Sequence, residues 1–204
     1  LKAQKKEANA VFSKYVSREY IEWLQPGNKE SPLMSHTLLK EKLIPNIKNG
    51  DGAFLIVIDN LRYDQWLTLK PLISEYFNIN EEGVYSSILP TATHYARNAL
   101  FAGLLPSEIE KIYPDLWASE EDEGSKNQHE HDLFNRLVKR SGKQWRTSYF
   151  KVLNSSFGKK VNDQFNNLIT NDLNLVVYNF VDMLSHAATD TKLVKELAED
   201  ESAY

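Results

Sequence analysis

The six-residue apolar segment Ala53–Ile58 is the feature that most constrains the fold of this chain. It is the longest uninterrupted apolar stretch in the sequence. A short strand of this kind is typical of a parallel sheet that is covered on both faces. The segment is far too short to cross a bilayer as a helix. We therefore expect Ala53–Ile58 to be a strand at the centre of an α/β fold.

The pattern after Gly52 alternates between strands and helices. Further strands are expected at residues 84–89, 144–152 and 175–181. Helices are expected at residues 63–77 with a break at Pro71, 93–102 ending at Gly103, 107–112, 132–139 and 189–199. Residues 118–131 are polar and acidic, so we expect a loop there. This alternation predicts a mainly parallel sheet with helices on both faces.

The first fifty residues have helical periodicity instead. An amphipathic helix is expected at residues 3–24, where Pro26 and Gly27 end it. Ser35 can cap a second helix that runs to about Lys48, which Pro45 ends or kinks. The periodicity changes near residue 50, so we expect a helical segment at 1–50 and an α/β domain at 51–204. The absence of an initial Met suggests a piece of a longer protein.

Composition excludes several classes of function. The net charge is −4, so the chain lacks the basic field that draws in a long nucleic-acid duplex. There is no cysteine, which excludes disulfides and thiolate zinc sites. The N-terminus has no signal-peptide pattern. We expect a cytoplasmic protein that is not associated with a membrane.

Four residues suggest a metal-activated nucleophile. Asp59, Thr93 and Asp182 follow predicted strands, and ligands of open parallel sheets bind at the carboxyl ends of strands. His186 lies four residues after Asp182, on the same face of a helical turn. A divalent cation lowers the pKa of a hydroxyl and makes it a nucleophile for phosphoryl transfer. Each residue alone also has a structural role, since Asp and Thr are common helix caps.

The motifs around these residues resemble the phosphodiesterases of the alkaline phosphatase superfamily. Pro90-Thr-Ala-Thr93, followed by Gly103-Leu-Leu-Pro106, resembles their nucleophile motif. Val181-Asp-Met-Leu-Ser-His186 keeps the Asp and His of their second metal motif but not its Pro and Gly. The segments 58–66 and 93–99 resemble a PglZ domain, and more narrowly the PorX-type response regulators of Bacteroidetes, which are tied to type IX secretion. Residues 1–50 resemble the linker of those regulators.

This resemblance implies a site and a substrate. It implies two zinc ions, one held by Asp59 and Thr93 and the other by Asp182 and His186. Thr93 would attack phosphorus in a short cyclic or linear oligonucleotide, such as a cyclic dinucleotide. A covalent phosphothreonine would form and then be hydrolysed. Their positions beside and one turn beyond Thr93, rather than the resemblance, make His94, Arg97 and Asn98 candidates for substrate contacts, and a surface position near the site is the alternative for each.

The implied ligand set is incomplete, because no Asp-His pair follows His186. A catalytically inactive docking module in a signalling pathway is therefore a second interpretation. Its expected partners are a second copy of the chain, a sigma factor or a sensor kinase. Asp59 as the phosphoacceptor of a receiver domain lacks the required second acid and lysine. His129 and His131, which flank Glu130, are expected to be exposed polar residues in the acidic loop.

Overall fold

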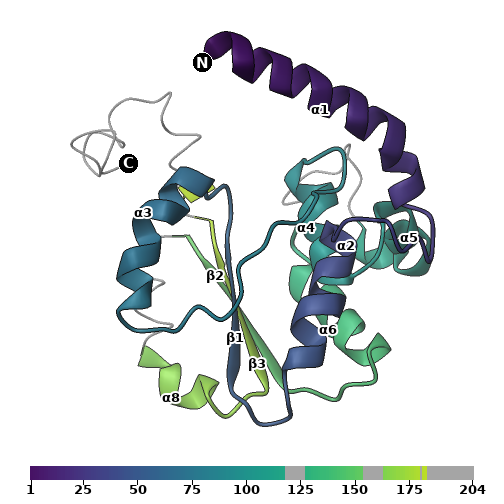
Figure 1. The fold of residues 1–204 in the computed structure, drawn as a ribbon. Helices are drawn as coiled ribbons and strands as arrows, with labels where there is room; N and C mark the ends of the chain where they lie inside the picture. Colours follow the sequence, from purple (N-terminus) through teal and green to yellow (C-terminus); the bar gives the residue numbers. More distant parts are fainter. Residues whose placement is uncertain (118–126, 154–162, 180, 183–204) are drawn as a thin grey trace. The chain divides into compact units, whose positions relative to one another are not determined.

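The computed structural model describes residues 1–117, 127–153, 163–179 and 181–182 (Figure 1). The chain forms two compact units, and each unit combines separate stretches of sequence. Unit 1 contains residues 1–39 and 83–127, and unit 2 contains residues 40–82 and 128–204. In the described part of the chain, no helix combines the length and apolar character needed to cross a bilayer. The expected division at residue 50 stays a prediction.

Unit 2 is built on a three-stranded parallel sheet with the order β1-β3-β2. Its strands are β1 (Ala53–Ile58), β2 (Thr147–Val152) and β3 (Leu173–Tyr178). The first residues of β1 and β2 both pair with Leu173, and their last residues both pair with Tyr178. The first five residues of the central strand β3 are buried. The predicted α/β class with a parallel sheet is therefore confirmed (Figure 1).

The helices of unit 2 differ from the predictions at Pro71. These helices are α3 (Tyr63–Ser74), α6 (Glu130–Arg140) and α8 (Phe165–Leu168). The predicted break at Pro71 is wrong, because Pro71 lies inside α3 and is exposed. The missing proline N–H costs a single helical hydrogen bond, and at an exposed position water can reach the carbonyl that loses it. The predicted helix at residues 189–199 lies outside the described residues.

The expectation that Glu130 lies in a polar, acidic loop is wrong. Glu130 is the first residue of α6 and its exposed fraction is 0%. The hydroxyl of Tyr149 in β2 donates a hydrogen bond to Glu130 Oε2 at 2.6 Å. Glu130 precedes Leu133, Phe134 and Leu137 on the buried face of the same helix. Helical spacing therefore places it in the interior, where the Tyr149 hydroxyl satisfies one of its two carboxylate oxygens.

Unit 1 consists of helices and extended segments. Its helices are α1 (Lys2–Trp23), α2 (Ser35–Leu38), α4 (Thr93–Ala102), α5 (Pro106–Ile112) and the short 3₁₀ turn η3 (Pro114–Leu116). The core of the unit includes the buried end of α4, from Ala99 to Ala102. α2 packs against α4. Gly103 ends α4 with φ 61°, and its N–H donates to Ala99 O, as the sequence predicted.

The second predicted helix is shorter than expected, and the second predicted strand does not join the sheet. The hydroxyl of Ser35 does not cap α2, because it accepts a hydrogen bond from the Ile88 N–H at 3.1 Å. Beyond α2 the chain continues as a π-helical turn, η1 (Leu39–Leu43), and a 3₁₀ turn, η2 (Ile44–Asn46).

Residues 84–89 do not join the sheet. They make a single β-bridge, between Met34 and Ser86, and Val84 is 90% exposed. The backbone of Ser86 in this segment pairs with Leu33 and Ser35, on either side of Met34, rather than with β1. Strand propensity depends on such tertiary context, which explains why the prediction of a second strand was wrong.

Candidate functional site

Two candidate carboxylates follow neighbouring strands of the sheet in unit 2. Asp59 comes directly after β1, and its N–H donates to Tyr178 O at 2.9 Å, which extends the pairing with β3 by one residue. Asp182 follows β3 and lies in a helical turn together with Val181. Both residues are partly exposed. Because β1 and β3 are parallel neighbours, Asp59 and Asp182 follow the same edge of the sheet, where ligands of α/β folds bind.

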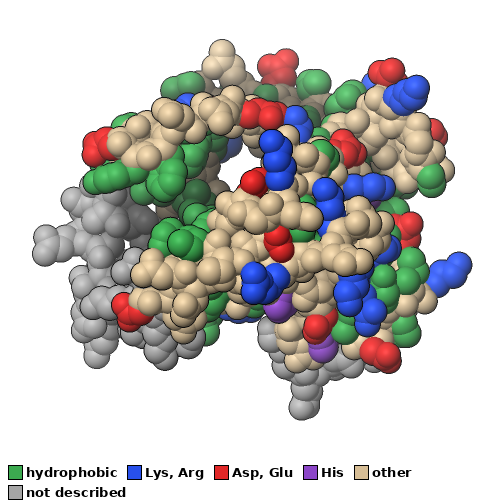
Figure 2. Space-filling view, turned by 90° about the horizontal axis from the view of Figure 1, so that it is seen from below, with side chains coloured by type: hydrophobic (Ala, Val, Ile, Leu, Met, Phe, Trp, Pro, Cys, Tyr) green, Lys and Arg blue, Asp and Glu red, His purple; other side chains and the backbone are tan. Residues whose placement is uncertain are grey.

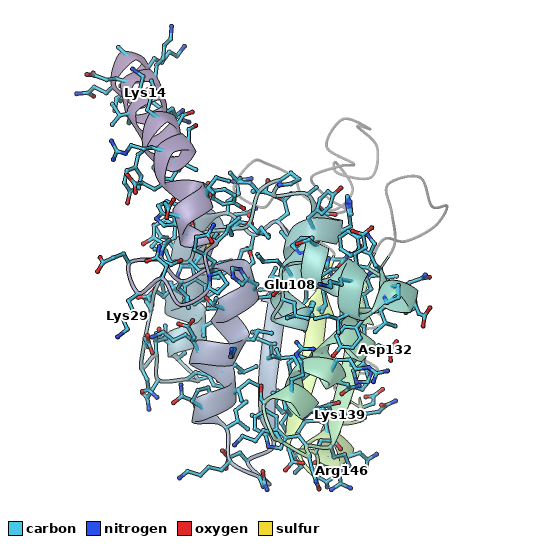
Figure 3. The ribbon with its side chains drawn as sticks, turned by 90° about the vertical axis from the view of Figure 1, so that its right-hand side faces the viewer. Lys14, Lys29, Glu108, Asp132, Lys139 and Arg146 are labelled. Carbon is cyan, nitrogen blue, oxygen red and sulfur yellow. The ribbon has the colours of Figure 1, made fainter. Side chains whose placement is uncertain are left out.

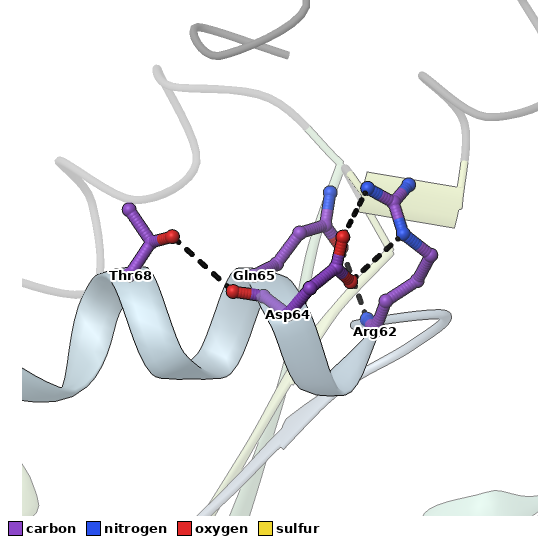
Figure 4. Close-up of polar contacts among 4 residues, drawn as sticks. All are labelled: Arg62, Asp64, Gln65 and Thr68. Carbon is purple, nitrogen blue, oxygen red and sulfur yellow. Dashed lines mark hydrogen bonds and ion pairs between the residues drawn. The ribbon is translucent and has the colours of Figure 1, made fainter. Parts of the chain in front are cut away.

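The turn after Asp59 is held by a group of local polar contacts (Figure 4). Asn60 has φ 60°, a left-handed conformation that Asn tolerates. Arg62 Nε and Nη2 donate to the two carboxylate oxygens of Asp64 at 3.0 and 3.1 Å. This hydrogen bond from Arg62 is the main cause that lowers the pKa of Asp64. The Arg62 N–H also donates to Gln65 Oε1, so the start of α3 is fixed directly after Asp59.

Thr93 lies in unit 1 and is the first residue of α4. It is exposed, and Ala92 is the N-cap residue, with no side-chain hydrogen bond capping the helix. The alternative prediction, that Thr93 is the N-cap residue of α4, is therefore wrong. The positive end of the α4 dipole favours negative charge at this position. An accessible hydroxyl at a helix N-terminus is suited to attack on an anionic phosphate ester.

The three candidate substrate contacts occupy different environments. His94 is partly exposed and lies in an aromatic group, with ring centroids 3.9 Å from Tyr95 and 6.4 Å from Trp117. Arg97 is only 6% exposed and Asn98 only 1%. The alternative expectation of surface positions is therefore wrong for Arg97 and Asn98. They precede the buried segment Ala99–Ala102 and share its interior environment.

The structure describes only part of the proposed metal site. Asp59 and Asp182 belong to unit 2 and Thr93 belongs to unit 1, while His186 lies outside the described residues. Within the described ranges, no group of three His, Asp or Glu residues is arranged to hold a metal ion. The oxygen donors of Asp59 and Asp182 have the chemistry that divalent cations bind, and a complete site needs further ligands.

Sequence reasoning missed a polar cluster between α6 and β2. His131 Nε2 lies 3.2 Å from Thr147 Oγ1, and the Thr147 hydroxyl donates to Asn135 Oδ1 at 2.6 Å. The His131 ring also stacks on Tyr149. Burial lowers the pKa of His131. His131 is thus half-buried rather than an exposed loop residue. The apolar periodicity of residues 133–138, continued backwards by one turn, could have revealed this.

Charged side chains of both signs are intermixed on the surface. On the face drawn in Figure 2, Lys and Arg side chains occur together with Asp and Glu side chains. This distribution agrees with the net charge of −4. A net charge of −4 does not provide the overall basic field that attracts a long nucleic-acid duplex.

Comparison with known proteins identifies the family. Residues 38–203 match the family described as the BREX system PglZ alkaline phosphatase-like domain. A search of curated proteins finds no match to this sequence. The matched segment begins in α2 and includes the whole sheet, α4, Asp59, Thr93 and Asp182. The match extends over well more than half of the chain, which therefore belongs to the PglZ family of alkaline phosphatase-like domains.

Proposed function

We propose that this chain contributes to a metal-dependent phosphodiesterase in which Thr93 is the nucleophile. The family is of the phosphoesterase type, a class of hydrolase. The observation that carries the proposal is the placement of Asp59 directly after β1 and of Asp182 shortly after the end of its parallel neighbour β3. An exposed hydroxyl at the N-terminus of α4 supplies the second component. Together these are the groups that a phosphoryl transfer through a covalent intermediate requires.

The proposed roles follow from the chemistry of each group. The Thr93 hydroxyl forms a bond to phosphorus while the bond from phosphorus to the leaving alcohol breaks. Water then cleaves the phosphothreonine and regenerates the hydroxyl. The helix N-terminus at Thr93 stabilises negative charge on the phosphoryl oxygens. We propose that His94, which is partly exposed and follows Thr93 in α4, contacts the substrate beside the nucleophile.

We propose that zinc is the cofactor. Asp59 and Thr93 would hold one ion, and Asp182 and His186 would hold the other. Carboxylate and imidazole groups are common zinc ligands, so these residue types fit this metal. When bound, zinc supplies Lewis-acid activation of the Thr93 hydroxyl and of the phosphate. We expect the ion binding at these four residues alone to be weak, because affinity depends on the number of ligands.

The proposed substrate is a short cyclic or linear oligonucleotide, and the proposed setting is a response regulator of the PorX type. The motifs 58–66 and 93–99 support this narrower assignment, as does the helical segment that precedes the matched domain. The intermixed surface charges also favour a small substrate over a long duplex. A sensor kinase or a sigma factor would be the partner in such a pathway.

The test is a single-turnover cleavage assay that compares Thr93→Ala with Thr91→Ala in the natural full-length protein. A small oligonucleotide and zinc are supplied, and circular dichroism checks folding. Removal of a covalent nucleophile should lower the rate by several orders of magnitude, that is, by more than about 10³-fold. Thr91 is also exposed but lies before α4, so its substitution should have a much smaller effect.

Two results would contradict this assignment. Cleavage by the Thr93→Ala variant at the wild-type rate would exclude Thr93 as the nucleophile. Equal loss of cleavage in both variants, with both unfolded, would show that the segment has a structural role only.

A further inference from the structure

The helix α1 carries an apolar face that remains exposed. Val11 is 64% exposed, Phe12 63% and Tyr15 44%. With Ala8 these residues follow a spacing of three and four, which places them on one side of the helix. They line a shallow depression together with Gln4 and Glu7. Trp23, at the end of the helix, is the only buried residue of α1.

The exposed position of this face calls for a partner. Figure 3 shows that the part of α1 with Lys14 extends beyond the parts of unit 1 that contain Lys29 and Glu108. Most of the stability of a helix in a protein comes from packing of its apolar face. A row of four apolar side chains in the middle of an exposed helix is therefore suited to binding another surface.

We propose that this face binds α1 of a second copy of the chain in antiparallel orientation. The order of side chains along the face provides the reason. In an antiparallel pair centred between Val11 and Phe12, each Val11 lies opposite Phe12 of the other helix. The small Ala8 then lies opposite the large Tyr15. Small and large side chains alternate across the contact, which gives close packing without cavities.

The charges at the two ends of the face favour the same orientation. Lys5 precedes the apolar row and Glu19 follows it on the same side of the helix. An antiparallel pair brings Lys5 of each copy beside Glu19 of the other, so the contact occurs twice by two-fold symmetry. In one copy alone, Glu19 pairs with Arg18 at 2.5 Å. A parallel pair would instead place like charges together, which is unfavourable.

Glu19 and Glu22 also argue against a membrane as the occupant. Both carboxylates lie on the side of α1 that continues the apolar row. Helices that bind anionic bilayers carry Lys and Arg along both flanks of the apolar face without carboxylates among them, whereas here Lys5 and Arg18 share the flanks of the row with Glu19 and Glu22. Because only four apolar side chains per copy are covered, the dimer should be weak, with a Kd in the range of about 10–100 μM.

Sedimentation equilibrium of the purified chain over a range of concentrations tests the proposal. The first pair of variants is Val11→Glu and Ser13→Glu, which add the same charge two positions apart, on opposite sides of α1. Val11→Glu should raise the dimer Kd by about tenfold or more, because it places a charge in the apolar contact. Ser13→Glu should leave the Kd within about twofold of the wild type.

The second set of variants tests the orientation. Lys5→Glu alone and Glu19→Lys alone should each weaken the dimer, and the double variant should restore it. Recovery of the wild-type dimer Kd in the double variant occurs only if Lys5 of one copy contacts Glu19 of the other. A wild-type chain that stays monomeric up to about 1 mM would overturn the proposal. Equal effects of Val11→Glu and Ser13→Glu, with circular dichroism showing both folded, would overturn it as well.

Discussion

At the scale of residues, the clearest single contribution to the sheet of unit 2 comes from Asp172. One of its carboxylate oxygens accepts a hydrogen bond from the Gly50 N–H at 2.6 Å, and the other accepts from the Arg146 N–H at 2.8 Å. Asp172 directly precedes β3, and its two partners lie shortly before β1 and β2. One side chain thus connects the chain segments that enter all three strands.

These bonds predict a pH dependence of stability. The hydrogen bonds from Arg146 and Gly50 lower the pKa of Asp172 below its ordinary value of 3.8. A carboxyl group whose pKa is lower in the folded chain stabilises the fold fully above its unfolded pKa, and this contribution is lost as the pH falls through the folded pKa. The thermal midpoint of the wild type should therefore fall more steeply between about pH 4 and pH 2 than that of Asp172→Asn.

The exposed Asp163 provides a control in the same unit. Asp163→Asn should reproduce the pH profile of the wild type. Identical acid profiles for Asp172→Asn and the wild type would show that the carboxylate makes no net contribution to stability.

At the scale of elements, the entry to β1 depends on a close approach of two backbone segments. Gly52 immediately precedes β1 and has φ 63°. A Cβ atom at this position would lie 2.8 Å from the carbonyl oxygen of Ile169, just beyond α8. Gly50 also has a positive φ, of 81°, but no atom lies within 4 Å of its Cβ position. A comparison of Gly50 with Gly52 therefore separates the cost of a left-handed backbone from the cost of the steric contact with Ile169.

Substitution of each glycine by alanine measures these two effects. Gly50→Ala should lower the free energy of unfolding by about 1 kcal/mol, the usual cost of a left-handed conformation with a Cβ. Gly52→Ala should cost more, by about 1–3 kcal/mol in addition, because the Ile169 backbone must shift. Urea unfolding monitored by circular dichroism measures both. Equal losses of stability in the two variants would mean that the backbone at Ile169 shifts away from the new Cβ atom with no cost in free energy.

At the scale of the whole molecule, the two units are not consecutive in sequence. The chain passes from unit 1 to unit 2 after residue 39, returns after residue 82, and passes to unit 2 again after residue 127. Unit 1 therefore depends on contacts between its two stretches. Met34, which is fully buried, forms the bridge with Ser86, and the Ser35 hydroxyl accepts the Ile88 N–H.

Deletion of residues 1–39 should accordingly destabilise α4 while β3 remains folded. The expected result is faster hydrogen exchange in α4, since α2 no longer covers it, and unchanged protection in β3. Deletion of residues 1–14 serves as the control, because it removes only exposed residues of α1. Unchanged protection of α4 after the longer deletion would contradict the dependence of unit 1 on its first stretch.

The sequence was most informative where structure depends on neighbouring residues. The α4 helix and its end at Gly103 were predicted correctly, since capping is a local property. The apolar strands β1 and β3 were also predicted, although β3 begins two residues earlier and ends sooner than expected. The sequence did not predict the fate of residues 84–89 or of Ser35. Ser86 pairs with Met34, and the Ile88 N–H donates to the Ser35 hydroxyl, so each contact joins residues about fifty positions apart.

The candidate site divides in the same way. Sequence alone selected Asp59, Thr93 and Asp182 by their positions at the ends of elements, and each position follows from local patterns. Three further candidates, His94, Arg97 and Asn98, were chosen by their closeness to Thr93 in the sequence. Closeness in the sequence does not show whether a side chain is buried. Tertiary packing placed Arg97 and Asn98 inside unit 1 and left His94 partly exposed. The ligand roles of these residues stay predictions.

By itself, the sequence determined the α/β class, because an apolar strand can be stable only when helices cover both faces of its sheet. It also determined the helix ends that glycine and proline specify. Only the tertiary structure decided the strand order β1-β3-β2 and the assignment of residues 83–127 to a unit with α1. It also decided the burial of Glu130 against Tyr149. These features depend on contacts between distant residues, whose free energy no local pattern contains.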